Sequence, residues 1–96
     1  MPRRELWAVL GSVLEALEAE RASPEPRLSN VATRANVAYA RLREHLSILA
    51  ARGLVDYEDI PRLTPRGQAF LREYRAWSGV LQTLAVLAAP RRPRGP

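Results

Sequence analysis

The chain has 96 residues, which is enough for one small domain. Hydrophobic residues make up 47% of it and charged residues 26%, values typical of a folded globular protein and not of a disordered chain. Cysteine is absent, which excludes disulfides and thiolate metal sites, and the single histidine, His45, argues against a histidine-rich zinc site. We therefore expect no metal and no cofactor.

The sequence contains no candidate for a membrane span. Its longest uncharged run, residues 76–90, is shorter than the roughly 20 mostly apolar residues that a spanning helix needs. Two arginines precede an apolar run near the N-terminus, as in a signal peptide, but that run reaches Glu15 and no small-residue cleavage site follows. We therefore expect a cytoplasmic protein without a membrane partner.

The net charge of +5 comes from arginine, because the chain has no lysine. Arginine presents a planar fork that pairs with phosphate and with the edge of guanine, so this composition favours a polyanionic partner. Residues 27–53 hold five Arg and one Glu, and residues 65–96 hold six Arg and one Glu, whereas residues 1–26 and 54–64 are net negative. An anion-binding surface is therefore expected in the two basic blocks.

Three helices are predicted in the first half of the chain. The first covers residues 4–21, where apolar residues recur every three or four positions from Leu6, and Trp7 widens this inward stripe. Prolines at 24 and 26 end the helix. The second covers residues 28–35, and a break follows at 36–37. The third runs from position 37 or 38 to 52, where a glycine stops it. Its inward residues are Leu42, Leu46 and Leu49, with Tyr39 assigned to the core edge in preference to a base-stacking role.

A short antiparallel hairpin is predicted next. Residues 54–57 alternate between apolar and polar, and residues 60–63 supply the return strand, which Pro61 confines to a sheet edge. The hairpin is acidic, because it contains three acidic residues, Asp56, Glu58 and Asp59, and only one basic residue, Arg62.

A long final helix is predicted over residues 65–88. Thr64 supplies a hydroxyl N-cap, and Pro65 suits the first helical position. Apolar residues then follow the 4-3 spacing of a coiled-coil seam over roughly 36 Å, which is longer than a small domain needs. Exposed apolar side chains on such a helix require a partner, so we expect a homodimer. The predicted dimerisation residues are Phe70, Tyr74, Trp77, Val80, Leu81, Leu84 and Leu87.

This order of elements is that of a winged helix-turn-helix. The expected fold class is mainly α, with a winged helix-turn-helix domain and its short two-stranded wing at residues 1–64. The expected chain continues with a C-terminal coiled-coil dimerisation helix at 65–88 and ends with a disordered basic tail at 89–96. The tail arginines fit phosphate binding and a merely solubilising terminus equally well.

The third helix carries the main predicted DNA contacts. With its leucines facing inward, Ala40, Arg43, Glu44 and Ser47 point outward and Arg41 lies on one flank. This face is small, polar and basic near its N-terminal end, which suits a helix in the major groove of DNA. An ordinary solvated face is the alternative interpretation of these arginines. The predicted DNA-binding residues are Arg34, Asn36, Ala40, Arg41, Arg43, Ser47, Arg62 and Arg66.

The sequence also resembles a known family. It is similar to small archaeal winged-helix DNA-binding proteins. The similarity lies in the runs ANVAY at 35–39, RGLV at 52–55 and LTPRG at 63–67, and in the apolar residues between and after them. The resemblance covers roughly residues 4–75. It implies a dimeric DNA-binding protein whose long C-terminal helices form an antiparallel coiled coil. Two departures are Ala38, where the family tends to have a Ser or Thr cap, and the acidic wing.

Two functions are consistent with these features. The leading hypothesis is a homodimer that binds double-stranded DNA as a nucleoid-associated chromatin protein or a transcriptional regulator. The alternative is a winged-helix protein–protein interaction module without DNA binding, which the acidic wing and the apolar final helix favour. An enzyme is not expected, because the sequence has no nucleophile–base pair, metal cluster or glycine-rich phosphate loop.

Overall fold

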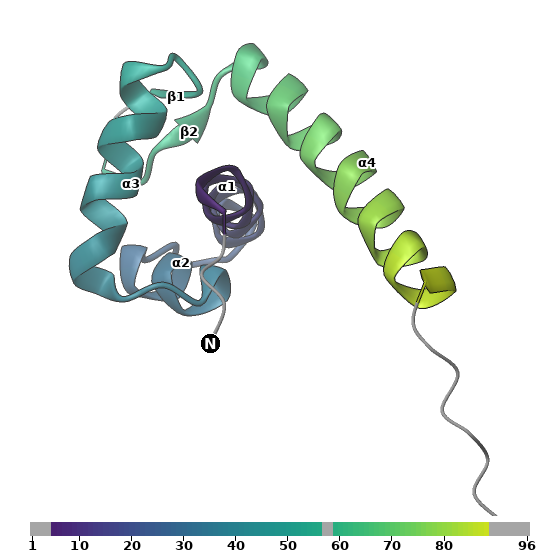
Figure 1. Ribbon diagram of the computed structural model, residues 1–96. Coiled ribbons are helices and arrows are strands. Elements are labelled where there is room, and N and C mark those ends of the chain that lie inside the picture. The colour runs from purple at the N-terminus through teal and green to yellow at the C-terminus, as the bar shows by residue number, and fades with distance from the viewer. Residues whose placement is uncertain (1–4, 57–58, 89–96) are drawn as a thin grey trace, which may run out of the picture.

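The computed structural model describes residues 5–56 and 59–88. The elements of this part of the chain are, in order, α1 (Leu6–Arg21), α2 (Leu28–Ala35), α3 (Tyr39–Ala51), β1 (Val55–Asp56), β2 (Arg62–Leu63) and α4 (Pro65–Ala88). Figure 1 shows α1 in the middle of the molecule, with α2, α3 and the hairpin around it and α4 on the side away from α3. The predicted mainly helical architecture with one small antiparallel sheet is confirmed. No helix in the described residues is long and apolar enough to cross a membrane.

Left-handed residues end α2 and α3 at the predicted places. Asn36 has φ 56°, and the backbone N–H of Val37 donates to the carbonyl of Ala32 at 3.0 Å, which closes the last turn of α2. Gly53 has φ 72° and ends α3 in the same way. Glycine and asparagine tolerate this backbone conformation better than other residues, so both helices stop where the sequence provides one of them. α3 is slightly shorter than predicted at both ends, whereas α2 and α4 have the predicted bounds.

The hairpin is shorter than predicted. β1 and β2 pair only through Val55 opposite Leu63 and Asp56 opposite Arg62. Pro61 precedes β2 and has no N–H with which to extend the ladder. The predicted strand residue 57 and turn residue 58 lie outside the described residues.

The hydroxyl of Thr64 joins the hairpin to α4. Its oxygen accepts a hydrogen bond from the Gly67 backbone N–H at 3.0 Å and donates one to the carbonyl of Gly53 at 2.6 Å. The predicted N-cap is therefore confirmed, and the same side chain also ties the start of α4 to the end of α3.

The core lies between α1, α2, α3 and the hairpin. Its buried hydrophobic residues are Leu10, Val13, Leu14, Ala16, Leu17, Val31, Ala32, Ala35, Leu42, Leu46, Leu49, Leu54, Val55, Leu63 and Leu71. Two expectations are wrong at helix starts. Leu6 and Trp7 were predicted to face inward but are exposed, since the core begins one turn later at Leu10. Tyr39, assigned to the core edge, is 55% exposed, because α3 begins at that residue and its buried stripe starts one turn later.

α4 packs against α1 at close range. A Cβ atom at Gly11 would overlap the ring of Tyr74, so only glycine allows the two helices to approach this closely. The Tyr74 ring also contacts Trp7 edge-on, with the ring centroids 5.7 Å apart. One turn earlier on α4, Leu71 is fully buried. The first half of α4 is thus part of the domain core.

Polar contacts flank this apolar packing. The Arg75 guanidinium pairs with Glu15 and Glu18 of α1, each at 3.5 Å, and the hydroxyls of Ser12 and Tyr74 lie 3.3 Å apart. The Arg75 pairs are half-exposed, so solvent screens them and they contribute little to stability. They join α4 to α1 at the edge of the apolar contact.

Candidate nucleic-acid interface

The outer face of α3 gathers four of the predicted DNA-binding residues. Three leucines of α3 are buried in the core, and the opposite face is exposed. Exposed together on that face are Ala40, Arg41, Arg43 and Ser47. At 100° per residue Ala40, Arg43 and Ser47 lie on one side of the helix, Arg41 lies on the flank, and the exposed Glu44 lies between Ala40 and Arg41. We call this surface the α3 outer face. A helix that is buried on one side and carries this surface on the other has the dimensions that fit a DNA major groove.

The two arginines of this face are held differently. Arg41 lies 3.6 Å from Glu44 one turn later, and both side chains are about two-thirds exposed. Such a surface pair is weak and gives way readily to a stronger anion. Arg43 makes no ion pair within residues 5–56 and 59–88. Both guanidinium groups are therefore available to an external phosphate or base.

Asn36 and Arg66 lie at opposite ends of α3. Asn36 is exposed in the turn that leads into the helix. Arg66 is exposed in the first turn of α4, and its aliphatic stem lies beside Gly53, just past the C-terminal end of α3. The structure therefore places one of these two exposed residues near each end of α3.

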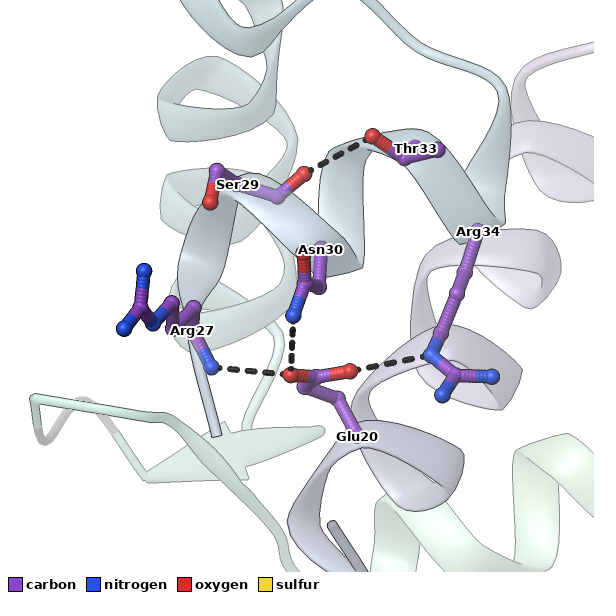
Figure 2. Close-up of polar contacts among 6 residues, drawn as sticks. All are labelled: Glu20, Arg27, Ser29, Asn30, Thr33 and Arg34. Atoms are coloured by element: carbon purple, nitrogen blue, oxygen red, sulfur yellow. Dashed lines mark hydrogen bonds and ion pairs between the residues drawn. The ribbon is translucent and has the colours of Figure 1, made fainter. Parts of the chain in front are cut away.

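Arg34 points elsewhere. Its Nε donates to Oε1 of Glu20 at 2.9 Å, and Figure 2 shows the side chain running from α2 down to the end of α1. On its far side it lines an open groove of about 460 Å³ with Arg75, between α1 and α4. Arg34 is thus separated from the α3 outer face, although the sequence grouped it with the other DNA contacts.

Arg62 also stands apart. It lies on β2, opposite Asp56, and lines a groove of about 250 Å³ together with Glu18, Arg21 and Gln68. Arg21 closes one side of this groove, where its Nη1 donates to the carbonyl of Ile60 at 3.0 Å. The hairpin base is therefore fixed to α1, and Arg62 faces the α1–α4 side of the molecule.

Glu20 is a buried structural residue that sequence reasoning missed. Its side chain is 1% exposed. Its carboxylate accepts hydrogen bonds from residues of α2 and from Arg27, the residue that precedes α2 (Figure 2). Oε2 accepts from the Asn30 side-chain amide and from the Arg27 backbone N–H, each at 2.9 Å, and Oε1 accepts from Arg34. A signal was present, because Glu20 follows Leu17 by three positions and so falls on the inward stripe of α1.

These hydrogen bonds keep Glu20 ionised. They hold the pKa of its carboxyl below the ordinary value, first through the Asn30 amide, then through the Arg27 backbone N–H, and then through the Arg34 side chain. Burial acts in the opposite direction and raises the pKa, but it does not prevail. The carboxylate therefore fixes α2, and with it the turn that leads into α3, onto α1.

The predicted dimerisation residues divide into two groups. Phe70 and Tyr74 are partly buried and pack against the core of their own chain. The remaining five are exposed and form what we call the α4 apolar strip. Its members are Trp77, Val80, Leu81, Leu84 and Leu87, with exposed fractions between 46% and 76%.

An aromatic notch lies where the strip meets α1. It has a volume of about 180 Å³ and is lined by Trp7, Phe70, Glu73, Tyr74 and Trp77. Three of its four aromatic rings come from α4 and one from the exposed start of α1. The apolar surface therefore continues from the end of α4 onto α1.

The described residues hold no cluster of three or more histidine, aspartate or glutamate side chains suited to a metal ion. Comparison with protein families and with curated proteins finds no match to this chain. The geometry of the α3 outer face and of the α4 apolar strip is thus the ground for a functional assignment.

Proposed function

We propose that this chain is a winged helix-turn-helix protein that binds double-stranded DNA as a homodimer, with α3 in the major groove. The observation that carries the proposal is the α3 outer face, where Arg41, Arg43 and Ser47 are exposed on a helix whose other side is buried. Side chains of these types supply the hydrogen bonds that phosphates and guanine edges accept.

The arrangement of the elements supports this assignment. α2 and α3 are joined by the short turn at Asn36, and the two-stranded hairpin follows α3 directly, as helix-turn-helix and wing do in this class of DNA-binding domain. α3 and α4 lie on opposite sides of α1 (Figure 1), so a partner on α4 leaves the α3 outer face open.

The charge distribution favours α3 over the hairpin as the DNA contact. The block of residues 27–53, which contains α2 and α3, holds five Arg and one Glu. The hairpin instead exposes Asp56 and Asp59. Carboxylates near phosphates are repelled, so in this proposal the wing does not touch the DNA backbone.

The α4 apolar strip supports the homodimer. Trp77, Leu81 and Leu84 follow the 4-3 spacing of a coiled-coil seam, and Val80 and Leu87 form a second apolar row beside them. Residues 76–88 contain no charged residue. An exposed apolar strip of this kind promotes aggregation in water unless a second apolar surface covers it. A second copy of the same helix offers a surface of matching spacing, which is the usual isologous solution for a two-fold dimer.

The experiment that tests DNA binding is a titration of a fluorescent duplex at several salt concentrations. Wild-type protein is expected to bind with a log affinity that falls linearly with log salt. Arg41→Ala with Arg43→Ala should reduce affinity at least tenfold and lower the salt slope by up to about 1.8, since each phosphate contact contributes about 0.9. The charge-matched control is Arg27→Ala with Arg72→Ala, two exposed arginines that lie outside α3.

Two results would contradict the proposal. Equal losses in the test variant and in the control would mean that net charge alone attracts DNA and that the α3 outer face has no special role. No binding at about 50 mM salt would favour the second candidate, a winged-helix protein-interaction module. The observation on the side of that candidate is the acidic hairpin with its exposed Asp56 and Asp59.

A further inference from the structure

Two arginines line one small groove without an acidic partner of their own. The groove has a volume of about 250 Å³ and lies where β2 contacts α1 and the start of α4 (Figure 1). Arg21 contributes to it from α1 and Arg62 from β2, and we call it the Arg21–Arg62 groove. Neither arginine takes part in an ion pair within the described residues. Two positive charges on one groove repel each other, and an anion between them would remove that cost.

Arg21 is the more enclosed of the two. It is half-buried at the end of α1, and its Nη1 donates to the Ile60 carbonyl at 3.0 Å, which holds the guanidinium at the base of the hairpin. A guanidinium has five N–H donors, and this is the one hydrogen bond that the side chain makes with the described part of the chain. A charge that is taken partly out of water is normally paired with an opposite charge. Arg21 therefore has donors to spare and an uncompensated charge.

Arg62 has an acidic neighbour that it does not use. Asp56 stands directly opposite Arg62 in the two-stranded ladder, so the two side chains share one face of the hairpin. They form no ion pair in the described structure, and Arg62 instead lines the groove with Arg21. The second arginine is thus directed toward the first, which favours an anion as the missing partner of both.

The other lining residues define what the groove accepts. Gln68 of α4 adds an amide that can donate a hydrogen bond. Glu18 is the one carboxylate among the lining residues, and Arg75 pairs with it at 3.5 Å, which offsets its charge. The volume lies just below the roughly 300–1,000 Å³ of pockets for drug-sized ligands, so the groove suits a small anion. Among such anions, phosphate matches the planar fork of arginine.

We propose that the Arg21–Arg62 groove binds the phosphate group of a small ligand. Arg21 and Arg62 donate to its oxygens, and Gln68 supplies a further donor. No residue of α3 lines the groove, so a small molecule and not the DNA at the α3 outer face supplies the phosphate. The bound group would join α1, the hairpin and α4 at one point. This binding does not depend on the proposed DNA binding, and either can fail without the other.

The experiment is a titration of the full-length, ¹⁵N-labelled protein with inorganic phosphate at pH 7, with ionic strength held constant by sodium chloride. Wild-type protein should show saturable NMR shifts of the Arg21 Nε–H and of the Gln68 side-chain amide. Arg21→Gln with Arg62→Gln should weaken phosphate binding at least about tenfold, because each removes hydrogen bonds from a charged donor. Arg62→Gln alone should also weaken it, and this exposed side chain makes no hydrogen bond whose loss would disturb folding.

Arg27→Gln with Arg72→Gln is the charge-matched control. Both arginines are exposed and neither lines the groove, so this variant should bind phosphate about as tightly as the wild type. An equal loss in the control would overturn the proposal, because net charge alone would then explain the binding. Shifts that do not saturate, or that leave Arg21 and Gln68 unmoved, would overturn it as well.

A duplex titration of the same variants identifies the source of the phosphate. The Arg21 and Arg62 double variant should lose no more duplex affinity than the control. A larger loss would overturn the proposal, since it would assign the groove to a phosphate of the DNA backbone. A wild type that binds no duplex at all would remove the proposed function but not this site, because the phosphate titration contains no DNA.

Discussion

Glu20 and Arg34 form an ion pair, with 2.9 Å between Oε1 and Nε, that joins the end of α1 to the end of α2. The carboxylate is buried and the guanidinium half-exposed, so the pair lies at the border between core and solvent. Arg34 is two residues before Asn36, where the chain turns toward α3. The pair therefore fixes the end of α2 to the end of α1.

Replacing Glu20 should reveal this role through pH. Glu20→Gln puts an NH₂ group among hydrogen-bond donors that need an acceptor, so the free energy of unfolding at pH 7 should fall. The folded pKa of Glu20 lies below its ordinary value of 4.5, so its contribution is complete above that value and is lost as the pH falls through the lowered pKa. Urea unfolding from pH 7 to pH 2 should show the gap between wild type and variant closing only below about pH 4.5.

Glu25→Gln is the control for that measurement. Glu25 pairs with Arg27 at 3.5 Å, but its side chain is 82% exposed. This variant should remain close to the wild type across the same pH range, as surface substitutions usually do. A gap of similar size for both variants would mean that the burial of Glu20 is not what matters.

Removing Arg34 should affect stability more than DNA binding. Arg34→Ala leaves Oε1 of Glu20 without a protein donor, which should lower the melting temperature. Because the side chain is directed at α1, duplex affinity is expected to change less than twofold, against at least tenfold for the double variant of Arg41 and Arg43. Thermal unfolding and duplex titration of the same samples check this. A tenfold loss of affinity with normal stability would restore Arg34 to the DNA contacts.

Two glycine-to-alanine substitutions should have opposite signs. Alanine in a helix normally stabilises by about 0.5–1 kcal/mol relative to glycine. Gly79→Ala should gain that amount, because its Cβ meets no atom within 4 Å. Gly11→Ala should instead lose about 1–3 kcal/mol, since its Cβ overlaps the Tyr74 ring and forces α4 away from α1. Chemical denaturation measures both, and stabilisation by Gly11→Ala would disprove the close α1–α4 contact.

Loss of the Thr64 cap should destabilise the start of α4. Thr64→Ala removes the acceptor for the Gly67 N–H and should cost about 1 kcal/mol, or roughly 4–8 °C in melting temperature. Thr64→Ser keeps the hydroxyl and should remain within about 0.5 kcal/mol of the wild type. As a control, Thr83→Ala removes an exposed hydroxyl that only bonds back to Gly79 and should have little effect.

Charges on the α4 apolar strip should separate the proposed dimer. Leu81→Asp with Leu84→Asp places two carboxylates in the apolar seam, so the molar mass from light scattering should fall from about twice 10.8 kDa to 10.8 kDa. Helix content should persist, because both side chains are exposed within one chain. Gln68→Asp, at an exposed α4 position away from the strip, should leave the mass unchanged. A monomeric wild type at micromolar concentration would contradict the dimer.

Local sequence signals determined the elements of this protein. Three kinds of signal predict the elements almost to the residue, because each acts within one turn of the chain. They are the helical spacing of apolar residues, Asn36 and Gly53 at the helix ends, and Thr64 before Pro65. The same periodicity identified the buried leucines of α3 and hence its outer face. These features depend on neighbours a few positions apart, which a sequence displays directly.

Only the tertiary structure decided which side chains meet. Arg34 and Arg62 belong to the basic residues of the sequence, yet contacts with α1 or the groove beside it direct them away from the α3 outer face. Tyr39 has core spacing but lies one turn before the core begins. The reason is physical: periodicity gives the direction of a side chain on its own helix, whereas burial and pairing depend on how helices distant in sequence pack together.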